Sequence, residues 1–112
     1  MEFKRVVPIF RIFSLEKARE FYLDFLGCKV EWEHRFEPGM PAFVSMARGR
    51  ARVFLSEHQG DARPDTLLYL VVGDTDAVAR EFGRPSGDQP YGCDFELRDP
   101  DGNRLRISSP AR

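Results

Sequence analysis

The chain has 112 residues, with 17 basic and 18 acidic side chains and a formal net charge of −1. This length suits one domain, and 42% hydrophobic residues with ten Phe can form a core without disulfides. The balanced charge and the lack of a basic run argue against nucleic-acid binding, and no apolar run approaches the roughly 20 residues of a membrane span. Met1–Arg5 lacks the apolar stretch of a secretion signal, so we expect a soluble, cytoplasmic protein in which Cys28 and Cys93 are reduced thiols rather than a disulfide.

The chain begins with a predicted strand and a predicted helix. An apolar, β-branched run predicts a buried strand over Arg5–Phe13. Pro8 places it at a sheet edge or beside a chain break in the sheet, because proline cannot donate a ladder hydrogen bond. Ser14 suits the N-cap of the helix that follows, and Gly27 suits its end. The apolar positions of this amphipathic helix are Leu15, Ala18, Phe21, Tyr22 and Phe25.

Three further strands complete the first half. Alternation over Cys28–Phe36 predicts that Val30, Trp32, His34 and Phe36 share one face, with Glu31, Glu33 and Arg35 on the other. Ala42–Arg48 and Ala51–Glu57 flank Gly49-Arg50, which is typical of a two-residue hairpin turn. A polar linker then covers residues 59–65.

The second half repeats this order in shortened form. Leu67–Val72 is a predicted strand, and Asp74 is a suitable cap for a short helix. Gly83–Gly92 is a long loop with room for one short edge strand. The last two predicted strands, Cys93–Arg98 and Arg104–Ser108, flank the turn Asp99-Pro100-Asp101-Gly102-Asn103. The chain is therefore expected to be an α+β protein with two βαβββ modules, residues 1–58 and 66–112, within one domain of residues 1–112.

Three motifs in this order resemble the vicinal-oxygen-chelate superfamily of glyoxalases, extradiol dioxygenases and bleomycin-resistance proteins. They are Leu15-Glu16-Lys17-Ala18-Arg19-Glu20-Phe21-Tyr22, then Leu26-Gly27, and the Asp99–Asn103 turn. The resemblance covers nearly the whole chain and looks most like the bleomycin-resistance branch. It implies the glyoxalase/bleomycin-resistance fold, in which two modules form a cupped mixed sheet, and a homodimer with or without exchange of strands.

The resemblance also implies where the metal ligands of the family's enzymes would fall. These positions are Val7, Leu67 or Thr66, Arg106 and, on the Ala51–Glu57 strand, Glu57. A cation cannot ligate a cation, and one carboxylate does not hold a divalent metal, so we expect no metal and no other cofactor. Ser-His-Asp or Cys-His spacing typical of a nucleophile is also absent from the sequence.

The candidate ligand-binding residues are those able to face a groove between the modules: Trp32, His34, Phe36, Phe54, Glu57, Tyr69, Tyr91, Glu96 and Arg106. Trp32 suits either a groove or the core, and His34 either the groove or ordinary packing. Counting across the final turn pairs Glu96 with Arg106, which places them in one ion pair or leaves them as solvent-facing strand charges.

Three functions fit these observations. The first is metal-independent binding of a drug or metabolite, with bleomycin as one candidate, in a groove at the dimer interface. Bleomycin is cationic, so its binders are expected to be acidic and aromatic; the local acidic residues are Glu31, Glu33, Glu37, Glu57 and Asp61, but Arg35, Arg48, Arg50 and Arg52 lie close in sequence. The second is a glyoxalase-like lyase or isomerase, or a dioxygenase-related enzyme, with a displaced metal site. The third is a scaffold whose dimer interface is its function.

Overall fold

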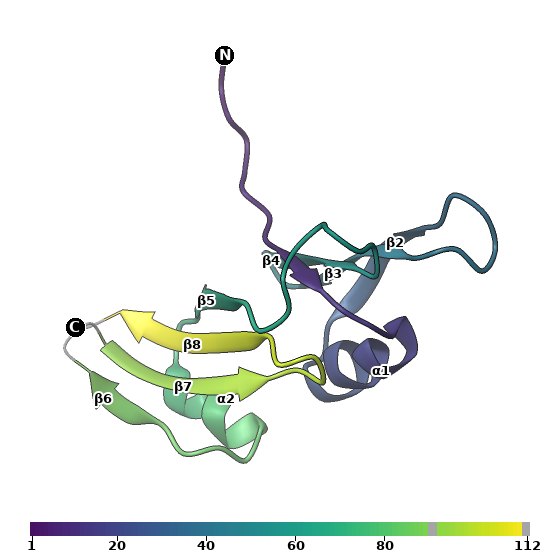
Figure 1. The fold of residues 1–112 in the computed structure, drawn as a ribbon. Helices are drawn as coiled ribbons and strands as arrows, with labels where there is room; N and C mark the ends of the chain where they lie inside the picture. Colours follow the sequence, from purple (N-terminus) through teal and green to yellow (C-terminus); the bar gives the residue numbers. More distant parts are fainter. Residues whose placement is uncertain (90–91, 111–112) are drawn as a thin grey trace. The chain divides into compact units, whose positions relative to one another are not determined.

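The computed structural model describes residues 1–89 and 92–110 and divides into two compact units, Met1–Pro64 and Asp65–Arg112 (Figure 1). Among the described residues, the first unit has a four-stranded sheet and one helical segment, formed by β1 (Ile9–Arg11), α1 (Leu15–Arg19), a π-helical continuation (Glu20–Phe25), β2 (Lys29–His34), β3 (Phe43–Arg48) and β4 (Ala51–Ser56). The second unit has the corresponding elements β5 (Leu67–Val71), α2 (Thr75–Glu81), β6 (Gly87–Gln89), β7 (Gly92–Arg98) and β8 (Arg104–Pro110).

The two sheets have the same topology. Their strand orders are β1-β4-β3-β2 and β5-β8-β7-β6, and in each the first strand runs parallel to the last strand of its unit while the other pairs are antiparallel. The prediction of an α+β protein with two βαβββ modules is therefore confirmed. The short edge strand expected within Gly83–Gly92 is β6.

Strand β1 lies at the edge of its sheet, as Pro8 predicts, but it is much shorter than expected. It pairs with Phe54–Ser56 of β4 over three residues only, and Val6 is 95% exposed. Pro8 accepts a hydrogen bond from the Phe54 N–H at 2.9 Å but has no N–H to donate in return. The ladder therefore ends at Pro8, and the predicted buried strand over Arg5–Phe13 is wrong in its first four residues.

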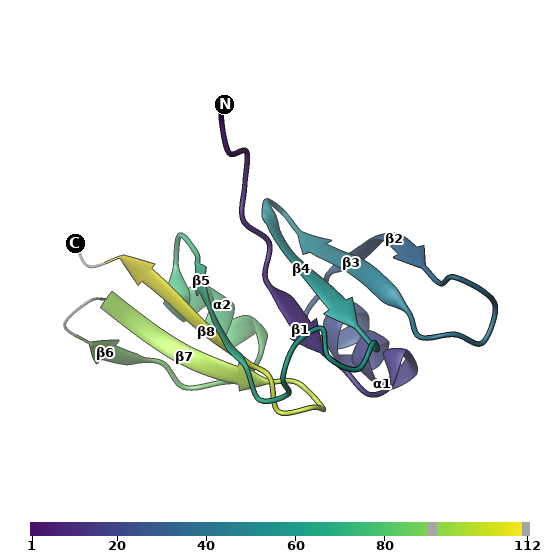
Figure 2. The ribbon, with the colours of Figure 1, turned by 45° about the horizontal axis from the view of Figure 1, so that its top comes forward.

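Helix α1 begins at the predicted cap, where Ser14 Oγ accepts the Lys17 N–H at 3.3 Å. The last turns widen into a π-helix, in which the Leu26 N–H donates to the Phe21 carbonyl at 2.8 Å. Figure 2 shows α1 along one face of the first unit's sheet. Tyr22, in the π-helical continuation, is fully buried. The sheet side chains buried in this core include Phe10, Val44, Met46, Val53 and Leu55.

The Asp99–Asn103 turn is fixed by side chains that the sequence identifies. Asp99 Oδ1 accepts the N–H groups of Asp101 at 2.8 Å and of Asn103 at 2.9 Å, while Asn103 Oδ1 accepts the Thr66 N–H at 3.1 Å. Gly102 supplies a positive φ of 84°. These bonds tie the β7–β8 turn to the start of β5 within the second unit.

None of the helices in the described part of the chain has the length and apolar character needed to cross a bilayer.

Candidate ligand-binding site

The face of the first unit's sheet opposite α1 carries three aromatic rings on neighbouring strands. Trp32 of β2 lies nearly parallel to Phe43 of β3, with centroids 5.7 Å apart and an angle of 20° between the planes. Phe54 of β4 lies 5.2 Å from Trp32 and 5.4 Å from Phe43. Trp32 is 43% exposed, so part of its ring surface remains open to a ligand within this unit.

A β-bulge in β2 decides which side chains accompany Trp32. Val30 pairs with Met46 and Trp32 pairs with Ser45, so Glu31 is the extra residue of the bulge. Since consecutive strand residues point to opposite faces, Val30 faces the core and Trp32 faces outward. The prediction that they share a face is therefore wrong. Glu31, predicted on the opposite face to Trp32, lies beside it and accepts the Ser45 hydroxyl at 2.6 Å.

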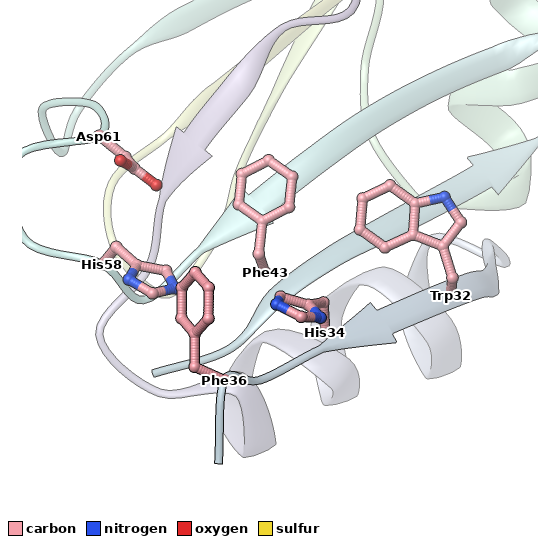
Figure 3. Close-up of a pocket in the computed structure, with 6 residues that line it drawn as sticks. All are labelled: Trp32, His34, Phe36, Phe43, His58 and Asp61. Atoms are coloured by element: carbon pink, nitrogen blue, oxygen red, sulfur yellow. The ribbon is translucent and has the colours of Figure 1, made fainter. Parts of the chain in front are cut away.

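A pocket of about 440 Å³ opens on this face (Figure 3), lined by Trp32, His34, Phe36, Phe43, His58 and Asp61. The ring of Phe36 lies edge-on to the imidazole of His34 at 5.0 Å and to that of His58 at 6.1 Å. This volume falls within the range of small-molecule sites in proteins, and the lining is largely aromatic with a few polar atoms.

Ser56 orders the loop that carries His58 and Asp61. Its buried hydroxyl donates to Asp61 Oδ2 at 2.5 Å and accepts the backbone N–H of His58 at 3.1 Å. The Ser56 proton is thus held by a carboxylate and not by an imidazole, and the oxygen is closed off from a substrate. Ser56 therefore positions His58 and Asp61 in the pocket wall, and the three side chains do not form a nucleophile assembly.

Glu57 is engaged with the backbone. Its Oε2 accepts the N–H of Leu15, the first residue of α1, and its Oε1 accepts the N–H of Ala42, both at 2.9 Å. The guanidinium of Arg35 lies 3.6 Å from Oε1 of Glu57, and the Glu57 side chain is 19% exposed. Glu57 is not one of the residues that line the pocket.

Three other candidates lie on the second unit's sheet. Tyr69 of β5 and Glu96 of β7 are the two register partners of Arg106 in β8, so these three side chains share one face. Glu96 Oε1 lies 3.7 Å from the guanidinium of Arg106 and 3.7 Å from that of Arg104. The predicted pairing of Glu96 with Arg106 is confirmed, and of the two alternatives left open for their side chains the structure shows the ion pair. Tyr91 lies outside the described residues.

The pocket therefore brings together three candidates, Trp32, His34 and Phe36, and a fourth candidate, Phe54, touches Trp32 beside it. The candidates chosen from the sequence omitted Phe43, His58 and Asp61. The signal for Phe43 was its position in the strand next to Trp32. The signal for His58 and Asp61 was their place in the loop that follows the last strand of the module.

The residues at the family's metal positions do not fit a metal. Val7 is aliphatic, and the second-module position falls on aliphatic Leu67 or on Thr66, whose neutral hydroxyl is not a usual metal ligand. Arg106 is a cation beside Glu96, and Glu57 already accepts two backbone amides. Within residues 1–89 and 92–110, no group of three or more His, Cys, Asp or Glu side chains is arranged to hold a metal ion.

Comparison with protein families supports the architecture described above. A family model for "Glyoxalase superfamily protein" matches residues 1–111, and the chain belongs to this superfamily. A comparison with curated protein sequences finds no match.

Solved structures show the same fold. The bleomycin-binding protein of bleomycin-producing Streptomyces verticillus, complexed with copper(II)-bleomycin, matches with a TM-score of 0.78 and 26% identity over 99% of both chains. TnmS3, an antibiotic binding protein from Streptomyces sp. CB03234, matches with a TM-score of 0.71 and 22% identity over 99% of this chain and 100% of its own. Lactoylglutathione lyase from Agrobacterium tumefaciens matches with a TM-score of 0.69 and 17% identity over 94% and 92%. The predicted glyoxalase/bleomycin-resistance fold is confirmed.

Proposed function

We propose that this protein binds a small aromatic molecule in the pocket of the first unit and sequesters it without chemical change. The observation that carries the proposal is the nearly parallel pair of Trp32 and Phe43 at the wall of an open pocket. Aromatic rings with an accessible face gain contact area and stacking energy from planar ligand groups. The similarity to a protein complexed with copper(II)-bleomycin makes a bleomycin-like drug the first candidate ligand.

Binding in this proposal is independent of a protein-bound metal. Its support is the chemistry of the residues at the positions that the resemblance implies for the family's metal ligands, which are Val7, Leu67 or Thr66, and Arg106. The polar side chains of the pocket are suited to orienting a ligand. Asp61, for example, is held in place by a hydrogen bond from the buried hydroxyl of Ser56.

We further propose that two chains pair, that the ligand groove is completed at their interface, and that the protein is cytoplasmic. Support for pairing comes from edge strand β5, where Leu67, Tyr69 and Val71 are 38%, 49% and 66% exposed on one face. Exposed apolar side chains on an edge strand are typical of a surface that another chain covers. Tyr69, Glu96 and Arg106 would then contribute a second, more polar surface to ligands. The free thiol of Cys28 supports a reducing compartment.

Calorimetric titration with metal-free bleomycin, with and without EDTA, tests the proposal. We expect a dissociation constant of about 10 μM or lower, unchanged by EDTA, with quenching of the fluorescence of Trp32, the sole Trp. Trp32→Ala should weaken binding by about tenfold or more, since aromatic anchors dominate such sites. Phe13→Ala, which removes an exposed ring outside the pocket, is the control.

Three outcomes would each contradict a part of the proposal. Absence of heat and of quenching would remove bleomycin as the ligand. Equal affinity of the Trp32→Ala and wild-type proteins would remove this pocket as the site. Sedimentation at the mass of one chain over the same concentrations would remove the pairing.

A further inference from the structure

The rings of Trp32, Phe43 and Phe54 form an aromatic site on the open face of the first unit's sheet. We infer that Arg52 sets the charge preference of this aromatic site, because its ion pair with Glu31 masks the carboxylate beside Trp32. As a result the site selects planar aromatic groups without positive charge over cationic ones at this position. The inference rests on the proposed function and specifies the class of ligand that the site takes.

Both oxygens of Glu31 are engaged by Arg52. Oε1 accepts from Arg52 Nε at 2.6 Å and Oε2 accepts from Arg52 Nη2 at 2.7 Å, which is the bidentate geometry of a strong Arg–carboxylate pair. The hydroxyl of Ser45, a fully buried residue, donates a third hydrogen bond to Oε1 at 2.6 Å. The side chains of Arg52 and Glu31 are only 24% and 32% exposed, so the pair is held on the sheet surface and does not extend into solvent.

This ion pair lies next to the aromatic rings. The bulge in β2 places Glu31 on the same face as Trp32, and Trp32 is the register partner of Ser45. Ser45 is in turn the register partner of Phe54, which lies two residues beyond Arg52 on β4. The carboxylate next to Trp32 is therefore part of a neutral Glu31–Arg52 pair, which lies beside the pocket and is not among its lining residues.

The remaining acidic residues of this unit do not restore an acidic site. Glu33 pairs with Arg19 and Arg35 at 3.2 Å each, and Glu57 accepts two backbone amides. Glu37 is exposed in the loop before β3 and does not line the pocket. Among the described residues, Asp61 is the one carboxylate that lines the pocket, and it accepts the hydroxyl of Ser56. The acidic groove expected for a binder of cations is therefore reduced to a single carboxylate.

Variants that uncover or remove the masked charge test this inference. Arg52→Gln leaves Glu31 without its cation, while Arg50→Gln removes the same charge from the exposed β3–β4 turn and serves as the matched control. The double variant Glu31→Gln/Arg52→Gln removes both charges and leaves uncharged polar side chains at both positions. The probes are acridine and 9-aminoacridine at pH 8, which have the same ring system and are neutral and singly positive, respectively. Affinities are measured by calorimetry at low ionic strength.

We expect wild type to bind acridine at least as tightly as 9-aminoacridine. Arg52→Gln should bind 9-aminoacridine about fivefold more tightly than wild type, with acridine unchanged, because an exposed carboxylate attracts a nearby cation; added salt should reduce this gain. Arg50→Gln and the double variant should keep the wild-type preference. If Arg52→Gln loses its wild-type circular dichroism, Glu31→Gln gives the reverse test, since an unopposed Arg52 should weaken 9-aminoacridine binding about fivefold.

Two results overturn the inference and are distinguishable. If both probes bind but Arg52→Gln and Glu31→Gln keep the wild-type ratio of affinities, the ion pair does not set the preference, and the proposed site survives. If neither probe binds to any variant, the aromatic site itself is refuted, and the inference is refuted with it.

Discussion

Glu57 provides a sharp test of how this fold positions its parts. Its carboxylate joins the start of α1 to the start of β3 through the Leu15 and Ala42 N–H groups, each at 2.9 Å. A hydrogen bond to a charged group contributes about 1.5–3 kcal/mol. In glutamine an NH2 group replaces one of the two accepting oxygens, so one of the two amides loses its acceptor. We therefore expect Glu57→Gln to lower the free energy of unfolding by about 2 kcal/mol and Glu57→Ala, which loses both bonds, by about 4 kcal/mol.

Urea unfolding, followed by Trp32 fluorescence and circular dichroism, measures these differences. A loss of about 2 kcal/mol moves the midpoint of unfolding by about 1 M urea in a domain of this size. Glu37→Gln is the matched control, because Glu37 is exposed in the loop before β3 and should change the free energy by less than about 0.5 kcal/mol. If Glu57→Gln behaves like this control yet loses ligand affinity, Glu57 is a binding residue and its role in joining α1 to β3 is refuted.

Two further predictions concern backbone conformation and thiol chemistry. Gly102→Ala should lower the free energy of unfolding by about 1–2 kcal/mol because Gly102 has a φ of 84°, whereas Gly73→Ala, outside the left-handed region and in open space, should be nearly neutral in the same urea assay. Burial raises the pKa of the Cys28 thiol to about 11 against the opposing effect of Arg48, so peptide mapping should find slow alkylation of Cys28 at pH 8 and faster alkylation as the pH approaches 11. Since the folded state holds this proton more tightly, the unfolding free energy of wild type should fall relative to Cys28→Ala as the pH rises from 9 to about 11; rapid alkylation at pH 8 would contradict this.

Local chemistry explains why much of the fold was predictable from sequence. The caps Ser14 and Asp74 act within three residues of themselves, and both form the expected side-chain hydrogen bonds. The Asp99–Asn103 turn has a fixed length, so counting across it gives the pairing of Glu96 with Arg106 without any tertiary information. These features depend on short stretches of chain, which is where sequence patterns are informative.

The role of Glu57 was not predictable, because its partners are distant in sequence. The Leu15 N–H lies 42 residues away from Glu57 in sequence. No local pattern shows that this N–H, at the start of α1, takes its acceptor from another element. A carboxylate at the end of a strand looks equally suited to a ligand, to a metal or to solvent. Only the tertiary structure shows that its oxygens accept two backbone amides.

The bulge in β2 connects the fold, the site and its charge. A period of two residues cannot reveal an inserted residue, so strict alternation placed Trp32 on the face of Val30. The insertion of Glu31 reverses the faces of the residues after it, and Trp32 is thereby moved from the core side, where Val30 pairs with Met46, to the open side. The same insertion brings a carboxylate onto the aromatic face. Arg52 compensates the charge of this carboxylate, because its Nε lies 2.6 Å from Glu31 Oε1. The bulge therefore accounts both for the aromatic surface and for the Glu31–Arg52 pair beside it.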